Sequence, residues 1–141
     1  MEIRIHQLPK INLTANRLKT ICRAVVNDLQ LNVASLDVIF VDDATLRDMH
    51  REYLNDDTFT DVMTFNLGED RIEGEIYISS DRAKEQAAGF GVTVQEEVLR
   101  LTIHGLLHLA GYEDGTPQQR AEMKKIEDRL VETYRDKLLT D

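Results

Sequence analysis

Apolar residues recur at helical spacing in several stretches of the chain. Within residues 14–29 they step by three, one, three, one and three positions, which places them on one face of a helix. A shorter helical face covers residues 46–53, before a polar stretch at residues 55–60 breaks the pattern. Helix start and stop signals predict another short helix over residues 80–89. Proline at the first helical position predicts a long amphipathic last helix over residues 117–138.

One predicted helix differs from these because it is apolar on nearly every side. Thr93 and Glu96 form a capping-box pattern, in which each side chain bonds the free backbone N–H of the other at a helix start. The helix that follows is almost wholly apolar over residues 98–110, and Gly111 can end it. We therefore expect it to lie buried at the centre of the domain.

Alternation of apolar and polar residues predicts the strands. Ile3 and Ile5 alternate with polar neighbours, and residues 36–41 are rich in the β-branched and aromatic residues that favour strands. Residues 61–67 and 75–79 alternate in the same way on either side of a turn-rich link. These last two strands predict a hairpin with a longer loop.

Together these elements predict the fold class and the domain count. We expect an α+β fold with a mixed sheet of about four strands packed with about five helices, and a metal site on the buried central helix. The chain has no repeat, low-complexity tract or linker rich in proline, glycine and serine, so a single domain over residues 1–141 is expected.

Composition and charge narrow the class of protein. The net charge of −9 argues against indiscriminate binding of nucleic acid and gives no sign of a DNA-binding protein. The apolar runs are too short to cross a membrane. The single cysteine, Cys22, excludes a disulfide framework, and the first residues do not form a secretion signal, so we expect a cytoplasmic location. The densest basic patch is formed by Arg17, Lys19 and Arg23. It is either a solvated helix face or a phosphate contact.

The buried helix carries the candidate chemistry. His104 and His108 are four residues apart, so both imidazoles lie on one face of the helix. Gly111 lets the chain reverse, which brings Asp114 back towards them. Two histidines, one carboxylate and an open fourth position are the ligand set of a hydrolytic zinc site. Glu113 is the competing candidate for the third ligand.

The spacing of these residues matches the metzincin pattern H-E-x-x-H-x-x-G-x-x-H with two departures. Gly105 stands where the peptidase has its general-base glutamate, which argues against a metallopeptidase. Asp114 stands in place of the third histidine. The same ligand set also occurs in non-haem iron oxygenases, and a core helix with two histidines and no metal is the plainest alternative.

Three blocks of sequence occur in a specific order along the chain. They are Thr60-Asp61-Val62-Met63-Thr64-Phe65, Gly74-Glu75-Ile76-Tyr77-Ile78-Ser79 and His104-Gly105-Leu106-Leu107-His108-Leu109-Ala110-Gly111-Tyr112. Together they resemble the YbeY family of bacterial rRNA maturation factors. The resemblance runs from about Val38 to the last helix. It implies a zinc-dependent endoribonuclease, specific for single strands, that acts in 16S rRNA 3′-end maturation and ribosome quality control.

The resemblance also assigns residues, position by position. The three metal ligands of the family fall on His104, His108 and the position that Asp114 occupies here. The family often has an arginine just after the aromatic at Tyr53, where this chain has Leu54. Arg51, Arg100 or the helix face formed by Arg17, Lys19 and Arg23 are then the candidates for binding the RNA phosphates.

Two functional hypotheses follow from these residues and from what the resemblance implies. In the first, one zinc ion per chain promotes attack on an RNA phosphodiester, with Asp61 or Glu113 as the proton acceptor unless the metal hydroxide serves alone. The acidic chain then receives its rRNA from the small ribosomal subunit or from ribosome-associated proteins. In the second, the protein is a non-catalytic ribosome assembly factor whose metal only holds the last helix to the core.

Overall fold

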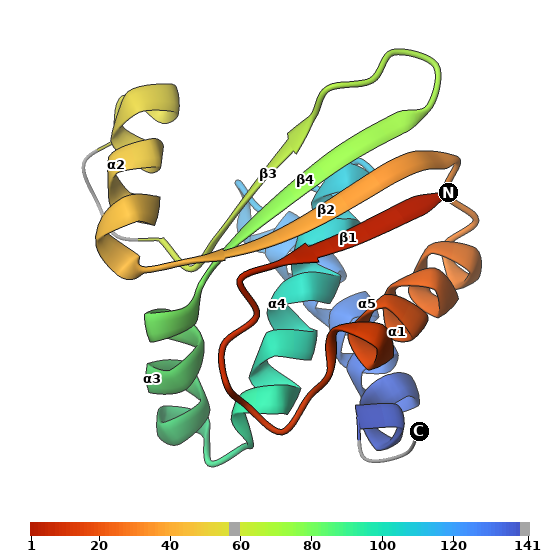
Figure 1. Ribbon diagram of the computed structural model, residues 1–141. Helices are drawn as coiled ribbons and strands as arrows, with labels where there is room; N and C mark the ends of the chain where they lie inside the picture. The colour runs from red at the N-terminus through yellow and green to blue at the C-terminus, as the bar shows by residue number, and fades with distance from the viewer. Residues whose placement is uncertain (57–59, 139–141) are drawn as a thin grey trace.

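The computed structural model describes residues 1–56 and 60–138 and shows an α+β fold, as predicted (Figure 1). In the described part of the chain, five α-helices accompany one four-stranded sheet. The elements in chain order are β1 (Glu2–His6), α1 (Ala15–Asp28), β2 (Val33–Val41), α2 (Asp43–Leu54), β3 (Val62–Asn66), β4 (Ile72–Ser79), α3 (Ser80–Phe90), α4 (Val94–Leu109), α5 (Pro117–Tyr134) and the 3-10 turn η1 (Arg135–Leu138).

The sheet is mixed and has the strand order β1-β2-β4-β3. β1, β2 and β4 run parallel, whereas β3 is antiparallel to β4, so the predicted hairpin is confirmed. Two strands begin earlier than their apolar cores predict. β2 begins at Val33 and β4 at Ile72, because these two residues pair with each other and extend the ladder beyond the alternating segments.

The buried central helix is α4, which packs against the inner face of the sheet (Figure 1). Two glycines set how closely it approaches β4. A Cβ added at Gly105 of α4 would lie 2.7 Å from Ile76, and one added at Gly74 of β4 would lie 2.6 Å from Leu109. Position 105 therefore faces the sheet, and both contacts fix the helix that bears the two histidines.

Two predicted helix ends are wrong. The helix predicted to stop at Gly89 continues to Phe90, and Gly91 ends it with a left-handed φ of +68°. The Gly91 N–H bonds the carbonyls of Ala87 and Ala88, as a C-terminal cap should. The last helix ends at Tyr134 and not at Leu138, because the final turn tightens into η1.

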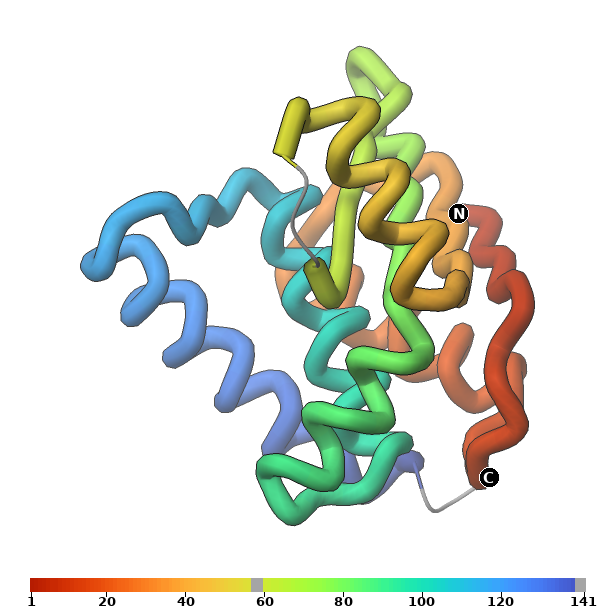
Figure 2. Tube along the Cα trace, turned by 90° about the vertical axis from the view of Figure 1, so that its left-hand side faces the viewer, coloured from red at the N-terminus to blue at the C-terminus, as the bar shows by residue number. Residues whose placement is uncertain are grey.

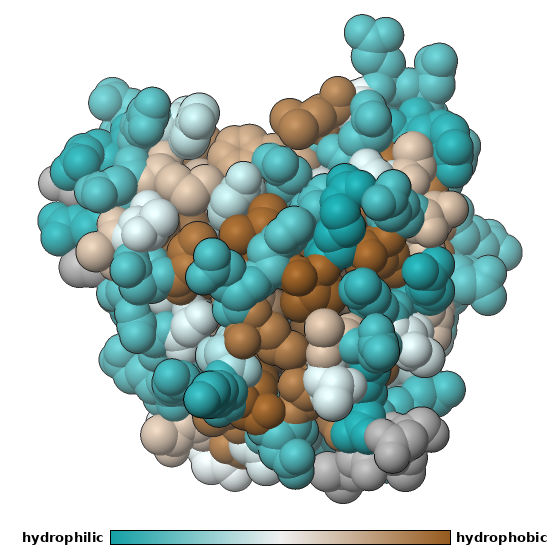
Figure 3. Space-filling view, viewed as in Figure 1, coloured by the Kyte–Doolittle hydropathy of each residue, from teal (hydrophilic) through white to brown (hydrophobic). Residues whose placement is uncertain are grey.

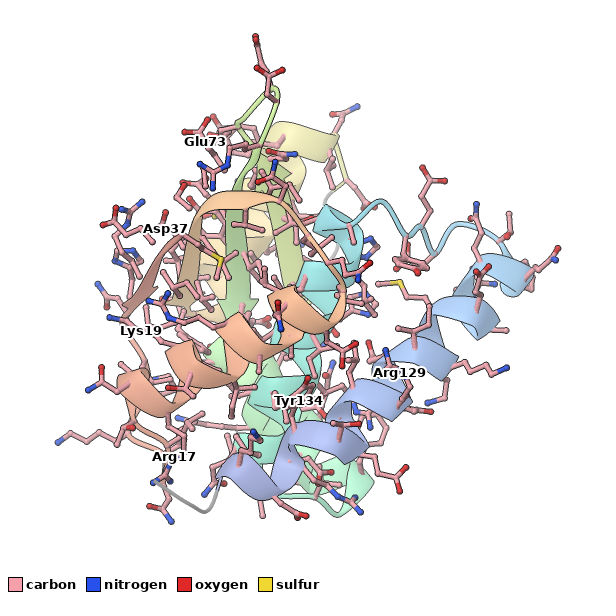
Figure 4. The ribbon with its side chains drawn as sticks, turned by 90° about the vertical axis from the view of Figure 1, so that its right-hand side faces the viewer. Arg17, Lys19, Asp37, Glu73, Arg129 and Tyr134 are labelled. Carbon is pink, nitrogen blue, oxygen red and sulfur yellow. The ribbon has the colours of Figure 1, made fainter. Side chains whose placement is uncertain are left out.

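α5 is held against α1 by a small polar cluster. Arg129 of α5 donates to the Asp28 carboxylate at 3.1 Å, and the Tyr134 hydroxyl lies 3.0 Å from the same carboxylate. Figure 4 shows Arg129 and Tyr134 on the side of α5 that faces α1. In the basic patch on α1, Arg17 donates to the carbonyl of Leu138 at 2.7 Å and so binds η1. This anchoring places the middle of α5 beside α4, where the candidate site lies.

The outer surface has a mixed character. On the face seen in Figure 1, apolar residues gather in a central band between hydrophilic flanks (Figure 3). Among the described residues, no helix is both long and apolar enough to span a bilayer. Of the polar stretch expected at residues 55–60, residues 57–59 lie outside the described residues.

Candidate metal centre

Three side chains converge at the C-terminal end of α4. The Nε2 atoms of His104 and His108 are 3.1 Å apart. The Oδ2 atom of Asp114 lies 3.5 Å from the first and 3.4 Å from the second. In the described part of the chain, these residues form the group of three potential ligand atoms close enough together to hold a metal ion.

The triangle has the dimensions of one face of a metal coordination tetrahedron. With ligand bonds of about 2.0–2.2 Å, neighbouring ligand atoms of a tetrahedral zinc site lie about 3.3–3.6 Å apart. The two histidine–aspartate distances of 3.5 and 3.4 Å match this spacing, and the histidine–histidine distance of 3.1 Å is slightly shorter. The fourth coordination position is open to solvent, because the side chain of Asp114 is 48% exposed and both imidazoles are about one-quarter exposed. The residues therefore fit a metal ion with an open position.

Each histidine is oriented by a partner at its other ring nitrogen. Nδ1 of His104 lies 2.7 Å from Oε1 of Glu127, and Nδ1 of His108 lies 3.0 Å from the carbonyl oxygen of Tyr112. With Nδ1–H as the donor in both rings, each Nε2 presents its lone pair towards Asp114. A carboxylate or carbonyl behind a histidine is the usual support of a metal ligand.

Glu127 is itself held in place by an arginine. It belongs to α5, is 8% exposed, and accepts a hydrogen bond at Oε2 from Nη1 of Arg100 at 2.9 Å. The same Nη1 atom lies 2.6 Å from Asp128. Arg100, predicted to contact substrate, thus sits next to the site with its guanidinium engaged by two carboxylates.

The surroundings of His104 favour its charged form. Burial lowers the pKa of this imidazole, but the hydrogen bond and the negative charge of Glu127, together with the charges of Asp61 and Asp114, outweigh burial. The pKa of His104 is therefore raised. A proton then competes with a metal for this side chain up to a higher pH than for an ordinary histidine.

The loop after α4 places Asp114. Gly111 adopts a φ of +101°, which glycine tolerates and which turns the chain back as predicted. Arg120 of α5 donates to the backbone carbonyl of Asp114 at 3.2 Å. The neighbouring Glu113 accepts instead from the side chain of Gln119 at 3.3 Å, so the geometry favours Asp114 as the third ligand.

Two hollows meet at His104. The larger has a volume of about 460 Å³ and is also lined by Asp61, which accepts a hydrogen bond from Gln86 at 3.2 Å. The smaller, of about 190 Å³, lies on the side of Asp114. Lys124 of α5 lines both, and its side chain is 71% exposed. In Figure 2, α5 runs along the left of α4, and α3 lies in front of α4 and below α2.

Two predicted site residues lie away from these hollows. Arg51 is on α2, where it donates to Asp48 at 2.9 Å, and it is not among the described residues that line either hollow. Glu113 does not line them either. Their roles in substrate binding and proton transfer stay predictions.

The position at which a metzincin peptidase has its general base holds a glycine in this chain. Gly105, which occupies the place of the metzincin glutamate, faces Ile76 of the sheet at a distance that leaves no room even for a Cβ. A glutamate at this position could not be accommodated without moving α4. The packing of α4 thus explains why this position holds glycine.

Comparison with known proteins places the chain among its relatives. The family model described as "Endoribonuclease YbeY" matches residues 3–135. The chain belongs to the YbeY family. A curated protein named Endoribonuclease YbeY from Chlorobium phaeovibrioides is 36% identical over 132 residues, covering 93% of this chain and 89% of the relative. Another with that name from Flavobacterium psychrophilum is 42% identical over 101 residues, covering 70% and 71%. The resemblance seen in the sequence is therefore confirmed.

A solved structure shares the fold of this chain. The solution structure of TM1509 from Thermotoga maritima matches with a TM-score of 0.62 and 29% sequence identity. The match covers 99% of this chain and 95% of the other. The shared fold thus extends over the whole domain and is not limited to the histidine motif.

Sequence reasoning missed two residues of this YbeY-family site. Glu127 lies four residues after Met123 and three before Leu130, so it interrupts the apolar stripe of the last helix. A charged residue at a buried helical position was the available signal. Lys124 gave no such signal, because nothing distinguishes it in sequence from the other lysines of an exposed helix face.

Proposed function

We propose that this protein is a zinc-dependent endoribonuclease that hydrolyses phosphodiester bonds in single-stranded RNA. Membership of a family described as endoribonucleases supports the reaction class, a hydrolase acting on RNA. The observation that carries the proposal is the convergence of His104, His108 and Asp114 beside an open hollow. One zinc ion per chain would be held by these three side chains.

The chain's own residues prepare the site for this reaction. Zinc supplies Lewis acidity and lowers the pKa of a water that it binds to about 7. Glu127 and the Tyr112 carbonyl fix the ring orientation and the Nδ1–H tautomer of the two histidines. Because Asp114 is negatively charged, the net charge of this ligand set is one unit more negative than that of three neutral histidines.

Asp61 is the proton acceptor that the geometry favours. Its carboxylate lines the same hollow as His104, and its Oδ2 is held by Gln86. Glu113, the other predicted candidate, bonds Gln119 and does not line the hollow. We therefore assign to Asp61 the removal of a proton from the attacking water or 2′-hydroxyl.

The cations near the site have different assignments. Lys124 has an exposed cationic side chain that lines both hollows, so we propose that it contacts an RNA phosphate. Arg100 contributes through Glu127, which it holds. A role for Arg51 in binding more distant phosphates would require the RNA to extend over α2.

The biological setting follows from the family resemblance and from charge. We propose that the substrate is 16S rRNA near its 3′ end, cleaved during maturation and ribosome quality control in the cytoplasm. A chain with a net charge of −9 is poorly suited to capture bare RNA at physiological salt. The small ribosomal subunit or a ribosome-associated protein would therefore present the RNA to it.

The test combines metal analysis with RNA cleavage. Protein purified without an affinity tag should contain close to one zinc per chain and cut an end-labelled single-stranded RNA but not its duplex. His108→Ala should lose both zinc and cleavage while staying folded, and His6→Ala, on β1, should keep both. Full cleavage by a metal-free His108→Ala variant would refute the proposal.

A second function, the non-catalytic assembly factor, is favoured by one observation. The ligands and their supports join α4, the loop at Asp114 and α5, so a metal here would also tie the last helix to the core. Under this alternative, zinc raises the melting temperature and His108→Ala lowers it, but no RNA is cut by either protein.

A further inference from the structure

The 460 Å³ hollow extends well beyond the metal ligands. Its described lining comes from the chain before β3, from α3, α4 and α5, and from the turn between α3 and α4. These residues are Asp61, Gln86, Phe90, Val92, Glu97, Arg100, Leu101, His104, Lys124 and Glu127. The volume falls within the range of small-ligand sites, about 300–1,000 Å³. Because the hollow includes His104, whatever occupies it lies directly beside the bond to be cut.

Glu97, near the start of α4, is a buried carboxyl group that lowers the stability of the fold. It is 2% exposed, and its Oε1 atom has no hydrogen-bond partner within the described structure. Burial raises the pKa of this carboxyl to about 7. A buried polar atom without a partner destabilises a fold, and packing gives no reason to keep one. Glu97 therefore lines the hollow with a carboxyl group of which one oxygen, itself buried, has no partner among the described residues.

Phe90 provides a second and independent feature. It lies at the end of α3, lines the hollow, and is 68% exposed, which is unusual for a large apolar side chain. Gln86, one turn earlier on α3, adds a side-chain amide to the same wall. An aromatic ring at the rim and polar acceptors inside are the features with which proteins hold an unpaired nucleobase.

Other occupants fit less well. A phosphate inside the hollow would meet the carboxylates of Asp61, Glu97 and Glu127. Of the cations that line it, Arg100 is already engaged by two carboxylates, and Lys124 is exposed and suits a phosphate outside the hollow. A second metal ion would need clustered ligand atoms, and in the described chain the set of three that lies close enough is His104, His108 and Asp114. A flat, neutral group with hydrogen-bond donors satisfies both the apolar rim and the acidic interior.

We propose that this hollow binds one unpaired base of the RNA next to the cleaved bond and prefers guanine. Phe90 stacks on the base, and Glu97 accepts hydrogen bonds from its Watson–Crick edge. Guanine presents N1–H and N2–H side by side, which suits a carboxylate. Uracil presents one N–H between two carbonyls, which a carboxylate repels. The inference rests on the proposed function, since it takes RNA as the substrate.

The test measures nucleotide binding separately from cleavage. The zinc-loaded full-length protein is titrated at pH 8, where the Glu97 carboxyl is mostly ionised, with guanosine 5′-monophosphate and uridine 5′-monophosphate, and binding is followed by NMR chemical shifts. Any phosphate contribution is common to both, so the ratio of dissociation constants reports on the base. We expect guanosine monophosphate to bind at least about 10-fold more tightly.

Two variants and a control assign the preference to residues. Phe90→Ala, at an exposed position, should weaken the binding of both nucleotides by about 5-fold or more through loss of stacking. Glu97→Gln should reduce the preference for guanine and change the affinity for uridine monophosphate little. Glu85→Gln, an exposed glutamate of α3 outside the hollow, makes the same charge change and should alter neither.

The outcomes separate this inference from the proposed function. Equal binding of the two nucleotides, or binding untouched by both Phe90→Ala and Glu97→Gln, overturns the base pocket even if RNA is cut. A guanine preference that depends on Glu97, in a protein that cuts no RNA, supports the pocket and refutes the endoribonuclease.

Discussion

Nδ1 of His104 lies 2.7 Å from Oε1 of Glu127, so a carboxylate on α5 orients an imidazole on α4. The two residues are 23 positions apart in sequence, and their contact depends on how the two helices pack. Arg100 braces the same carboxylate from α4. The metal centre is therefore a product of the α4–α5 interface as well as of the histidine motif.

The first prediction concerns Glu127. Glu127→Gln keeps the shape of the side chain but removes the negative charge behind His104, so zinc affinity should fall by about 10- to 100-fold. Competition with a chromophoric chelator measures the change. Glu122→Gln, at an exposed position of the same helix, is the control and should bind zinc normally. Unchanged affinity in Glu127→Gln would mean that this hydrogen bond does not support the metal site.

The second prediction concerns the close approach of α4 to the sheet. Gly105→Ala would place a methyl group 2.7 Å from Ile76, and the resulting strain should lower the free energy of unfolding by about 1–3 kcal/mol. Gly89→Ala is the matched control, because it is helical and meets nothing within 4 Å. There, alanine should stabilise by about 0.5–1 kcal/mol. Urea unfolding of both variants measures the difference, and equal stabilities would contradict the packing argument.

The third prediction concerns acid stability at the outer face of the sheet. Arg4, through hydrogen bonds and charge, lowers the pKa of Asp37 to about 2, and His6 adds to the effect. Because the folded pKa lies below the unfolded one, the stabilisation is present above about pH 4 and is lost as the pH falls towards 2. The melting temperature of Asp37→Asn should therefore be lower than that of the parent at pH 7. Near pH 2 the two melting temperatures should be nearly equal. Figure 4 marks Asp37, well separated from α5.

A matched substitution makes the third prediction specific. Asp136→Asn, in η1, removes one negative charge at a distance from the Arg4–Asp37 pair. It should show no comparable loss at pH 7. A penalty for Asp37→Asn that persists unchanged down to pH 2 would show that packing, and not ionisation, accounts for it.

How much of the site could be predicted depends on the sequence distance of its parts. His104 and His108 share a helix face because of helix geometry alone, and Gly111 indicates the turn that leads to Asp114. Asp61 was suggested by the family motif, and only the packing of its segment over α4 brings it into the hollow with His104. Local patterns thus predict the ligands, whereas their support and surroundings are tertiary.

The same distinction explains the errors in the fold. Gly89 and Gly91 are both possible stops, and only the backbone shows that Gly91 adopts the left-handed conformation. β2 and β4 extend to Val33 and Ile72 because each strand completes the other's hydrogen bonds. Neither outcome is encoded in the alternation of apolar residues over a short segment.

The last prediction concerns the cost of burying Glu97. Its folded pKa of about 7 lies above that of an exposed glutamate, because burial disfavours the ionised form. For a raised carboxyl pKa, stability is greatest below the unfolded pKa of about 4.3 and falls as the pH rises through 7. Glu97→Gln removes the ionisation. The variant should therefore gain stability relative to the parent between pH 4.5 and 7.5, by up to about 3 kcal/mol.

Urea unfolding at several pH values measures this gain. Glu85→Gln, an exposed glutamate on α3, should show no pH-dependent difference from the parent. A flat difference for Glu97→Gln would mean that the carboxyl ionises in the fold as readily as in water. A gain that rises with pH, together with weaker discrimination of guanine, would show that the chain gives up stability at this position in return for a hydrogen-bonding group beside the metal centre.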